Sequence, residues 1–363
     1  MTPFVLARYL TVRFAIAMAS VTLALTAFVF ILVLAELFQR GAGRPEMTFT
    51  VCLTMAIFKL PMTMNKLLPF IALFSAIWMF ARLSRHHELV AVRASGVSAW
   101  QFIAPPIVVA ILAGVISTTA INPISAAAAS QFEQLEARYM RGKPSILAIF
   151  PTGVWLRQAD ASGQAVIHAL RAASEDLQLE DVIVFIYRGQ DVFERRLDAR
   201  SAKLDGGYWR LSDVYESRPG EASVHHDSYD LPTTLTPREV KDSVTSPDAV
   251  DFWDLPRFID TAERAGFSAT RHKMYWYSLM ALPLALGAMV VIAAAFALRP
   301  MRFGGTGQLL AMAAGVGFIF FFISDITQAL GLSGLVPPLL AAAAPTLTCI
   351  LFGATALLYL EDG

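Results

Sequence analysis

Long apolar stretches alternate with short polar breaks along most of the chain. A helix needs about 20 apolar residues to cross the hydrocarbon core of a bilayer, and six stretches reach that length. The first is also too long for the core of a signal peptide. The pattern therefore predicts a multi-pass helical membrane protein. The predicted spans are about Phe14–Phe38, Met62–Arg82, Trp100–Ile121, Met274–Leu298, Gln308–Leu330 and Pro337–Leu360.

The second apolar stretch, Phe49–Leu83, would exceed the bilayer thickness as one helix, because an α-helix rises about 1.5 Å per residue. We therefore predict an interfacial helix up to about Leu60 and a membrane span from Met62, kinked at Pro69. After the third span, the segment Ser125–Met140 stays helix-prone but turns polar. The third helix is expected to continue out of the membrane there.

The pattern changes between Lys143 and Val250, where short runs rich in β-branched and aromatic residues alternate with turn signals. Asp205-Gly206-Gly207 is typical of a tight hairpin turn. These features predict an all-β domain, a sandwich or an open roll, inserted between the third and fourth spans. The predicted strands are Gly153–Gln158, Ala165–Arg171, Val182–Arg188, Asp191–Leu197, Ala199–Leu204 and Tyr208–Tyr215.

A short amphipathic helix is predicted after this domain, at Asp254–Gly266, with Leu255, Phe258, Ile259 and Ala262 on one face. It is expected to lie on the bilayer. The predicted fold class is thus an α+β membrane protein of six transmembrane helices with an inserted β domain. Its parts are residues 1–141 with membrane helices 1–3, residues 142–250 with the β domain, and residues 251–363 with the interfacial helix and membrane helices 4–6.

A polar island, Arg82–Trp100, separates the second and third spans. Ser84 can cap a short charged helix, and Gly96 can end that helix in a left-handed conformation. Ser98 and Gln101 form a capping box for the next span. A simple turn needs fewer residues, so a separate helix, residues 84–97, is expected to touch a partner, although a solvated turn is the alternative.

Arginines near the spans gather on one side of the predicted topology. The positive-inside rule then places both termini and the polar island in the cytoplasm, and the β domain on the opposite side. The arginines on the first side are Arg8, Arg13, Arg82, Arg85, Arg93, Arg299 and Arg302, whereas the other side holds Arg40 and Arg44.

Composition agrees with this topology and narrows the chemistry. Hydrophobic residues make up 56% of the 363 residues and charged residues 16%, whereas soluble domains carry roughly 25% charged residues. A net charge of zero gives no support to nucleic-acid binding. Cys52 and Cys349 lie in apolar runs, as inert thiols do. The sequence shows no metal-ligand spacing, no phosphate-binding loop and no hydrolase motif, so no catalytic residue is predicted.

Charged residues at the ends of spans are the remaining candidates. Glu36 and Arg40 lie one helical turn apart, where they can meet; they either anchor the helix or handle a charged substrate. Asp325 and Gln328 share a face of the fifth span, and Asp325 is either functional or reaches interfacial water. In the polar island, Leu89 and Val92 form an apolar edge, and the charges are Arg85, Glu88 and Arg93.

The chain resembles the LptF/LptG family of lipopolysaccharide export permeases over essentially its full length. The order and spacing of several segments carry the resemblance. Two of them, Leu235–Val240 and the Asp254–Gly266 helix, are more similar to LptG than to LptF, and so is a further segment, Arg271–Ser278. The segments are Arg82–Ser98, Gly153–Arg157, Tyr208–Val214, Leu235–Val240, Asp254–Gly266, Ala297–Arg302, Gly315–Asp325 and Gly331–Pro338.

The resemblance implies a subunit of an ABC transporter in the inner membrane of a Gram-negative bacterium. An LptF-like subunit would complete a central cavity gated by the first and fifth helices. A separate LptB-like ATPase dimer would bind ATP and Mg, so this chain would hold no cofactor of its own. The inserted domain would be a periplasmic β-jellyroll that passes lipopolysaccharide to LptC-like and LptA-like proteins. An LptF-like role, or a membrane-anchored scaffold, is the alternative.

Site residues also follow from the resemblance. The polar island would be the coupling helix, with Arg85, Glu88, Leu89, Val92 and Arg93 facing the ATPase. Similar LptG proteins carry several lysines at the end of the first helix, but Val33 and Gln39 stand at two such positions here. Either the lipid is less phosphorylated, or Arg138, Arg141 and Lys143 take over. The implied lipid-contacting and gate residues are Glu36, Arg40, Arg44, Asp325, Gln328, Arg138 and Arg141.

Overall fold

The computed structural model describes the chain in two compact units. The helical unit comprises Met1–Phe132, Asp251–Trp253 and His272–Gly363, and the β unit comprises Glu133–Val250 and Asp254–Arg271. The described residues are 3–42, 47–86, 88, 92, 96–141, 147–150, 153–159, 163–173, 178–188, 192–233, 246–264, 269–297 and 306–362.

Within this described part, six helices are long and apolar enough to cross a membrane, which confirms the predicted spans. The third helix continues past its apolar part through a π-helical turn, as the polar extension predicted. The helices are α1 (Pro3–Gly41), α2 (Phe49–Arg85), α4 (Ala99–Ile116) with η1 (Ser117–Ile121) and α5 (Asn122–Glu136), α8 (Thr270–Ala297), α9 (Thr306–Leu332) and α10 (Pro338–Asp362).

Helix α2 is continuous over 37 residues, so the predicted break between Leu60 and Met62 is wrong. Both prolines of the stretch, Pro61 and Pro69, lie inside the helix. A proline removes one backbone hydrogen bond from a helix. Unwinding would expose further backbone groups, and in apolar surroundings no water would be there to bind them, so the helix continues. Next to Pro61, the Thr63 hydroxyl donates to the backbone oxygen of Lys59 (3.0 Å).

The end of α2 corrects a second prediction. The helix runs to Arg85, so Ser84 lies in its last turn and does not cap a new helix. The backbone N–H of His86 closes that turn by donating to the oxygen of Arg82 (3.2 Å). The predicted coupling helix falls mostly outside the described residues, but Gly96 has the positive φ (79°) expected of it. Ser98 and Gln101 form the predicted capping box.

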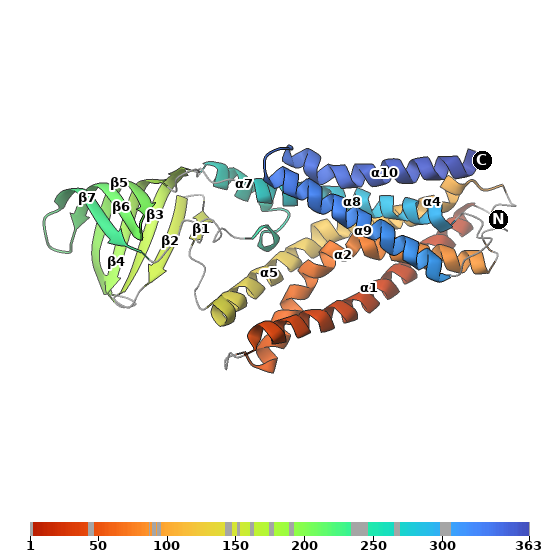
Figure 1. Ribbon diagram of the computed structural model, residues 1–363, viewed down its shortest axis with the longest axis horizontal. Helices are drawn as coiled ribbons and strands as arrows, with labels where there is room; N and C mark the ends of the chain where they lie inside the picture. The colour runs from red at the N-terminus through yellow and green to blue at the C-terminus, as the bar shows by residue number, and fades with distance from the viewer. Residues whose placement is uncertain are drawn as a thin grey trace. The chain divides into compact units, whose positions relative to one another are not determined.

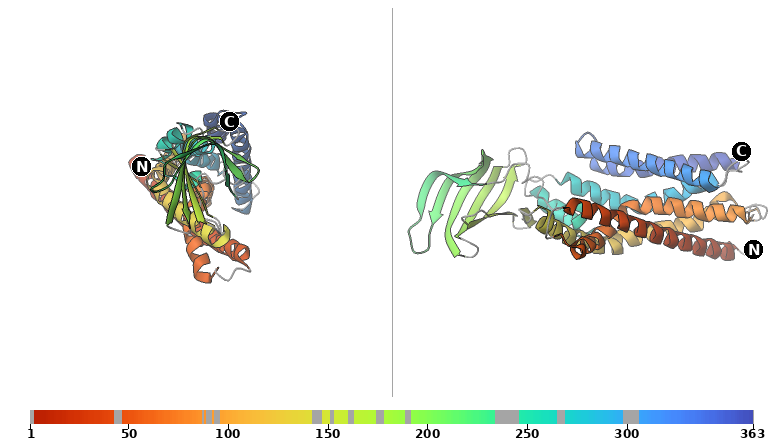
Figure 2. Two further views of the ribbon diagram at one scale, coloured as in Figure 1. Left: turned by 90° about the vertical axis from the view of Figure 1, so that its left-hand side faces the viewer. Right: turned by 60° about the horizontal axis from the view of Figure 1, so that its bottom comes forward.

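The core of the helical unit lies among α1, α2, α4 and α8, where Phe14, Phe80, Ile103 and Met289 are almost fully buried. Helices α4 and α8 pack closely at Gly114. A Cβ atom there would lie 2.5 Å from the Cα of Pro283, which is too close for any side chain. Figure 1 and Figure 2 show α1 beginning and α10 ending at the same end of this unit, as an even number of spans requires.

The β unit contains one twisted antiparallel sheet in which each described strand pairs with the next along the chain (Figure 2). This up-and-down order is that of the open roll, one of the two predicted alternatives. Gly206 and Gly207 both have positive φ, as the predicted hairpin turn needs. The strands are β1 (Leu147–Phe150), β2 (Gly153–Ala159), β3 (Gly163–Ala173), β4 (Gln178–Arg188), β5 (Val192–Asp205), β6 (Tyr208–Ser217) and β7 (Val224–Pro232).

Strand β5 is one strand of 14 residues, where two strands were predicted. The pattern placed a break at Asp198, but Leu197 and Ala199 on either side of it are both buried. Asp198 stays within the strand because its carboxylate pairs with the guanidinium of Arg196 (2.5 Å). Strands β1 and β7 were not predicted.

The predicted amphipathic helix is α7 (Leu255–Arg264). Leu255, Ile259 and Ala262 are buried, and Phe258 is half-buried, so the predicted apolar face is the one that packs. The helix begins with the Phe258 N–H donating to the oxygen of Asp254 (2.9 Å). Its predicted end, Gly266, lies outside the described residues.

Candidate functional site

A polar contact joins the start of α1 to the polar island. The Tyr9 hydroxyl donates to the carboxylate of Glu88 at 2.7 Å. The guanidinium of Arg13 lies over the Tyr9 ring, 5.0 Å from its centroid, within range of a cation–π contact. The half-buried Glu88 carboxylate therefore points to α1, a contact between residues 79 apart in sequence that the sequence pattern could not show.

Of the other four predicted coupling residues, the structure describes Val92 and Arg85. Val92 is half-buried and packs against the core of the helical unit, so it is not a freely projecting apolar edge. Arg85 is exposed in the last turn of α2. Leu89 and Arg93 lie outside the described residues.

A second charged cluster lies near the other end of α1. The Glu36 carboxylate accepts from Arg40 (3.2 Å), which confirms that this pair meets, and from Lys59 of α2 (2.9 Å). The Lys59 ammonium also lies 5.7 Å from the ring centroid of Phe132 in α5. This cluster therefore ties three helices together at one point.

Lys59 is the residue that sequence reasoning missed in this cluster. Its side chain is only 17% exposed, compared with 45% for Glu36 and 49% for Arg40. A lysine inside an apolar run needs an acidic partner, and that rule was the available signal. The partner could not be identified because 23 residues separate Lys59 from Glu36. Arg44 lies outside the described residues.

Asp325 and Gln328 are both exposed on α9, as expected of two residues on one face. Helix α9 packs against α2 and α10. In the part of the chain that the structure describes, no hydrogen bond or ion pair joins Asp325 to the Glu36 cluster. The structure therefore does not bring these two groups of predicted lipid-contacting residues together within one subunit.

Arg138 lies in a π-helical turn, η2 (Ala137–Arg141), and belongs to the β unit. Its guanidinium lies 5.4 Å from the ring centroid of Tyr139, and the side chain is exposed. The side chain of Arg141 and all of Lys143 lie outside the described residues.

The π-helical turn η1 and Asn122, the residue that follows it, anchor the segment that returns from the β unit, a feature the sequence did not reveal. Asn122 donates to the Tyr275 hydroxyl (3.1 Å) and accepts from the backbone N–H of Phe252 (2.7 Å). The indole N–H of Trp253 donates to the backbone oxygen of Thr119 (3.1 Å). These contacts hold the returning segment against the third membrane helix.

On the β unit, Glu216 is the centre of a charged cluster. Its carboxylate lies 2.9 Å from Arg218, 3.4 Å from Arg195 and 3.2 Å from the His226 ring. Burial acts to raise the pKa of Glu216, but the hydrogen bond and charge of Arg218, with Arg195, outweigh it and hold that pKa below its ordinary value. The same pairing raises the pKa of Arg218.

Large apolar side chains cover the outer faces of three helices, α1, α9 and α10, whereas most of the apolar part of α2 and α8 is buried. These faces can contact lipid tails or the apolar helices of another chain. They include Ile16, Leu23, Phe28, Ile31, Phe318, Phe322, Leu351 and Phe352.

Six apolar spans with a β unit inserted between the third and fourth are the arrangement that the resemblance to the LptF/LptG family implied. A family model described as lipopolysaccharide export system permease LptF/LptG matches residues 8–359. The chain belongs to the LptF/LptG family. This match extends across both units, so family membership applies to the whole described arrangement.

Two curated LptF/LptG relatives are LptG proteins. The lipopolysaccharide export system permease protein LptG of Escherichia coli (strain K12) is 24% identical over 298 residues, which are 80% of each chain. The LptG protein of Haemophilus influenzae (strain ATCC 51907 / DSM 11121 / KW20 / Rd) is 23% identical over 297 residues, 80% of this chain and 81% of the relative.

Proposed function

We propose that this protein is the LptG-like permease subunit of an ABC transporter that extracts lipopolysaccharide from the bacterial inner membrane. The family match over residues 8–359 carries the proposal, because it covers the six spans and the inserted β unit together. The similarity to two LptG proteins favours the LptG-like over the LptF-like role. Both termini would lie in the cytoplasm and the β unit in the periplasm.

An LptF-like subunit would cover part of the apolar surface of this chain. Helices α1 and α9 are long enough to cross the membrane, and the apolar part of each is mostly exposed in this chain. Facing the same helices of an LptF-like partner, they would enclose a central cavity and form its lateral gates. Asp325 and Gln328, which lie away from Glu36 within this chain, would then approach charged groups of the partner.

A separate LptB-like ATPase dimer would supply the energy, since the sequence has no phosphate-binding loop of its own. ATP and Mg would bind to that dimer, and this chain would contribute no enzymatic step. The polar island would dock on it through Arg85, Glu88, Leu89, Val92 and Arg93. The contact between Glu88 and Tyr9 supports a route from the docked island to α1.

Lipid phosphates would meet the cations at the far end of α1. Glu36 holds Arg40 and Lys59 together, so both cations lie at one place on the helical unit. Lys59 would replace one of the lysines that similar LptG proteins carry on the first helix. Arg44, Arg138 and Arg141 would contribute further contacts to lipid, and the β unit would pass lipid to LptC-like and LptA-like proteins.

Co-expression of the full chain with LptF-like and LptB-like partners tests the proposal. Native mass spectrometry of the purified complex is expected to show one copy of this chain, one LptF-like chain, two ATPase chains and bound lipopolysaccharide. A stable complex with a second LptG-like chain in place of the LptF-like chain would favour the LptF-like role. A complex without ATPase and without lipid would overturn the transporter and favour a scaffold.

A further inference from the structure

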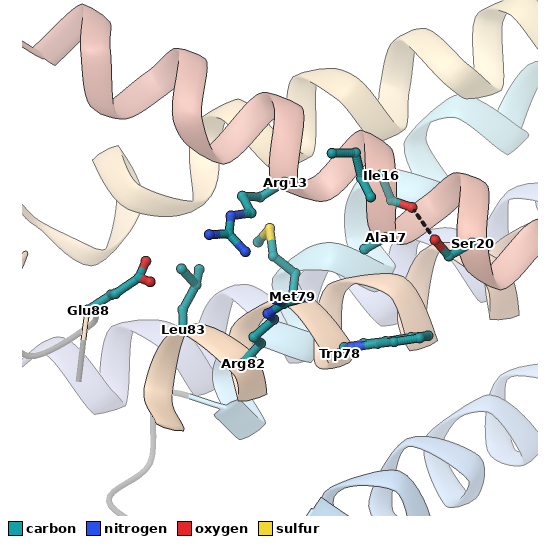
Figure 3. A pocket seen from close by; sticks show the side chains of 9 residues that line it. All are labelled: Arg13, Ile16, Ala17, Ser20, Trp78, Met79, Arg82, Leu83 and Glu88. Atoms are coloured by element: carbon teal, nitrogen blue, oxygen red, sulfur yellow. Dashed lines mark hydrogen bonds between the residues drawn. The ribbon is translucent and has the colours of Figure 1, made fainter. Parts of the chain in front are cut away.

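A hollow of about 220 Å³ lies between α1 and α2, at the end where the polar island connects to α2. Figure 3 shows Arg13 reaching into it from α1, Arg82 from α2, and Glu88 from the island. Buried Met79 and Leu83 form its apolar floor. The hollow lies wholly within the helical unit.

The charges around the hollow leave an excess of one positive charge, because two guanidinium groups face one carboxylate. Tyr9 positions one group of each charge, because its hydroxyl donates to the Glu88 carboxylate and its ring lies against the Arg13 guanidinium. Among the described residues, neither Arg13 nor Arg82 forms an ion pair with a carboxylate. Guanidinium groups suit phosphate oxygens well, because their planar N–H forks match the geometry of the anion.

The rim of the hollow is apolar and open. Ile16 is 60% exposed and Trp78 is 51% exposed, so both lie where lipid chains would run along α1 and α2. Tryptophan is enriched at the level of lipid headgroups, with its ring against the chains. A ligand that fits this hollow therefore combines an anionic group with apolar tails.

We propose that this hollow binds the phosphate group of an anionic glycerophospholipid, with the acyl chains lying against Ile16 and Trp78. A lipid with a net charge of −1 would neutralise the excess positive charge, whereas a zwitterionic lipid would bring a second cation next to Arg13 and Arg82. The site is separate from the charged cluster around Glu36, and it does not depend on lipopolysaccharide being the transported substrate.

Native mass spectrometry of the full-length protein, titrated with phosphatidylglycerol or phosphatidylcholine, tests this site. Phosphatidylglycerol is expected to bind at least about fivefold more tightly than phosphatidylcholine. Arg13→Gln and Arg82→Gln should each weaken the binding of phosphatidylglycerol about tenfold. Arg13→Lys, which keeps the charge, should retain most of it. Arg8→Gln is the matched control, because Arg8 is exposed on the same end of α1 but does not line the hollow.

Equal losses in Arg8→Gln, Arg13→Gln and Arg82→Gln would overturn the site and leave only general attraction to a charged membrane surface. Equal affinities for phosphatidylglycerol and phosphatidylcholine would also overturn the proposed site. A third arm uses inorganic phosphate as competitor: the proposal expects no displacement of the lipid, and full displacement at similar concentration would mean a simple anion site. Thermal unfolding of each variant near the wild-type temperature ensures that lost binding reflects the site itself.

Discussion

The Tyr9 hydroxyl and the Glu88 carboxylate lie 2.7 Å apart and connect the first helix directly to the segment that follows the second. We expect Glu88→Ala to release this segment and to reduce co-purification of an LptB-like ATPase while the helical unit stays folded. Pull-down from membranes that contain the whole complex measures the loss. Unchanged recovery of the ATPase would refute a coupling role for Glu88.

Tyr9→Phe distinguishes the contact between Glu88 and α1 from the proposed contact between Glu88 and the ATPase. This change removes the hydroxyl but keeps the ring that lies against Arg13. We expect the ATPase to remain bound, and lipid extraction per ATP hydrolysed to fall severalfold, because the island would move without carrying α1. Phosphate release and lipopolysaccharide transfer, measured together in reconstituted vesicles, give this ratio. A fall in both rates by the same factor would indicate a simple loss of structure.

Removing the Glu36 carboxylate should destabilise the helical unit, because Lys59 would stay largely buried without this partner. Breaking such a pair costs more than replacing both partners. We expect Glu36→Gln to cost about 1–2 kcal/mol, and the double variant Glu36→Gln with Lys59→Met to recover part of it. Arg40→Gln should cost about 0.5 kcal/mol or less, since that pair is half exposed. Thermal unfolding in detergent measures the stability of all three variants, and a double variant that is less stable than Glu36→Gln would contradict the importance of the Glu36–Lys59 pair.

Gly114→Ala should lower the unfolding free energy by about 1–3 kcal/mol, because the new methyl group would meet the backbone of Pro283 and force α4 and α8 apart. Gly315→Ala is the control: its Cβ would meet nothing within 4 Å, and alanine favours helix formation. Unfolding temperatures of the two variants should therefore move in opposite directions. Equal behaviour would show that the two helices are not packed this closely.

The charged cluster around Glu216 should make the β unit sensitive to acid. Because its pairing with Arg218 and Arg195 lowers the folded-state pKa below the ordinary value of 4.5, the cluster stabilises the folded state above that value. This stability is lost as the pH falls through the folded-state pKa. Hydrogen exchange of the β5 and β6 amides, measured as a function of urea concentration at several pH values from 7 to 3, should show this loss of stability.

Glu216→Gln is the control for that measurement, since it removes the ionisable group. The wild type should lose more stability on acidification than this variant does. Parallel pH profiles for the two proteins would mean that other groups cause the acid sensitivity.

The apolar pattern was sufficient to predict six spans, because length and hydrophobicity alone decide whether a helix can cross a bilayer. It failed at α2, where the length of the apolar stretch predicted a break between Leu60 and Met62, whereas the helix is continuous. It also missed β7, whose sequence is mostly polar and buries little apart from Leu231. A local sequence pattern therefore predicts an element only where the element is buried or exposed in the usual way.

Apart from the Glu36–Arg40 pair, the candidate sites were predictable only as single residues. Glu36 and Glu88 stood out as charges beside apolar runs, but their partners Lys59 and Tyr9 lie 23 and 79 residues away. Such pairs depend on how α1 packs against its neighbours, which no local pattern contains. The capping box of Ser98 and Gln101 was predicted correctly because its two members lie three residues apart.

Helix α1 is continuous from Pro3 to Gly41 and holds Tyr9 near one end and Glu36 near the other. At a rise of about 1.5 Å per residue, these two side chains are about 40 Å apart along one rigid rod. A helix that tilts as one body carries a tilt imposed at Tyr9 to Glu36, because no break separates the two residues. The two polar contacts would then open and close in step, as the two ends of one lever.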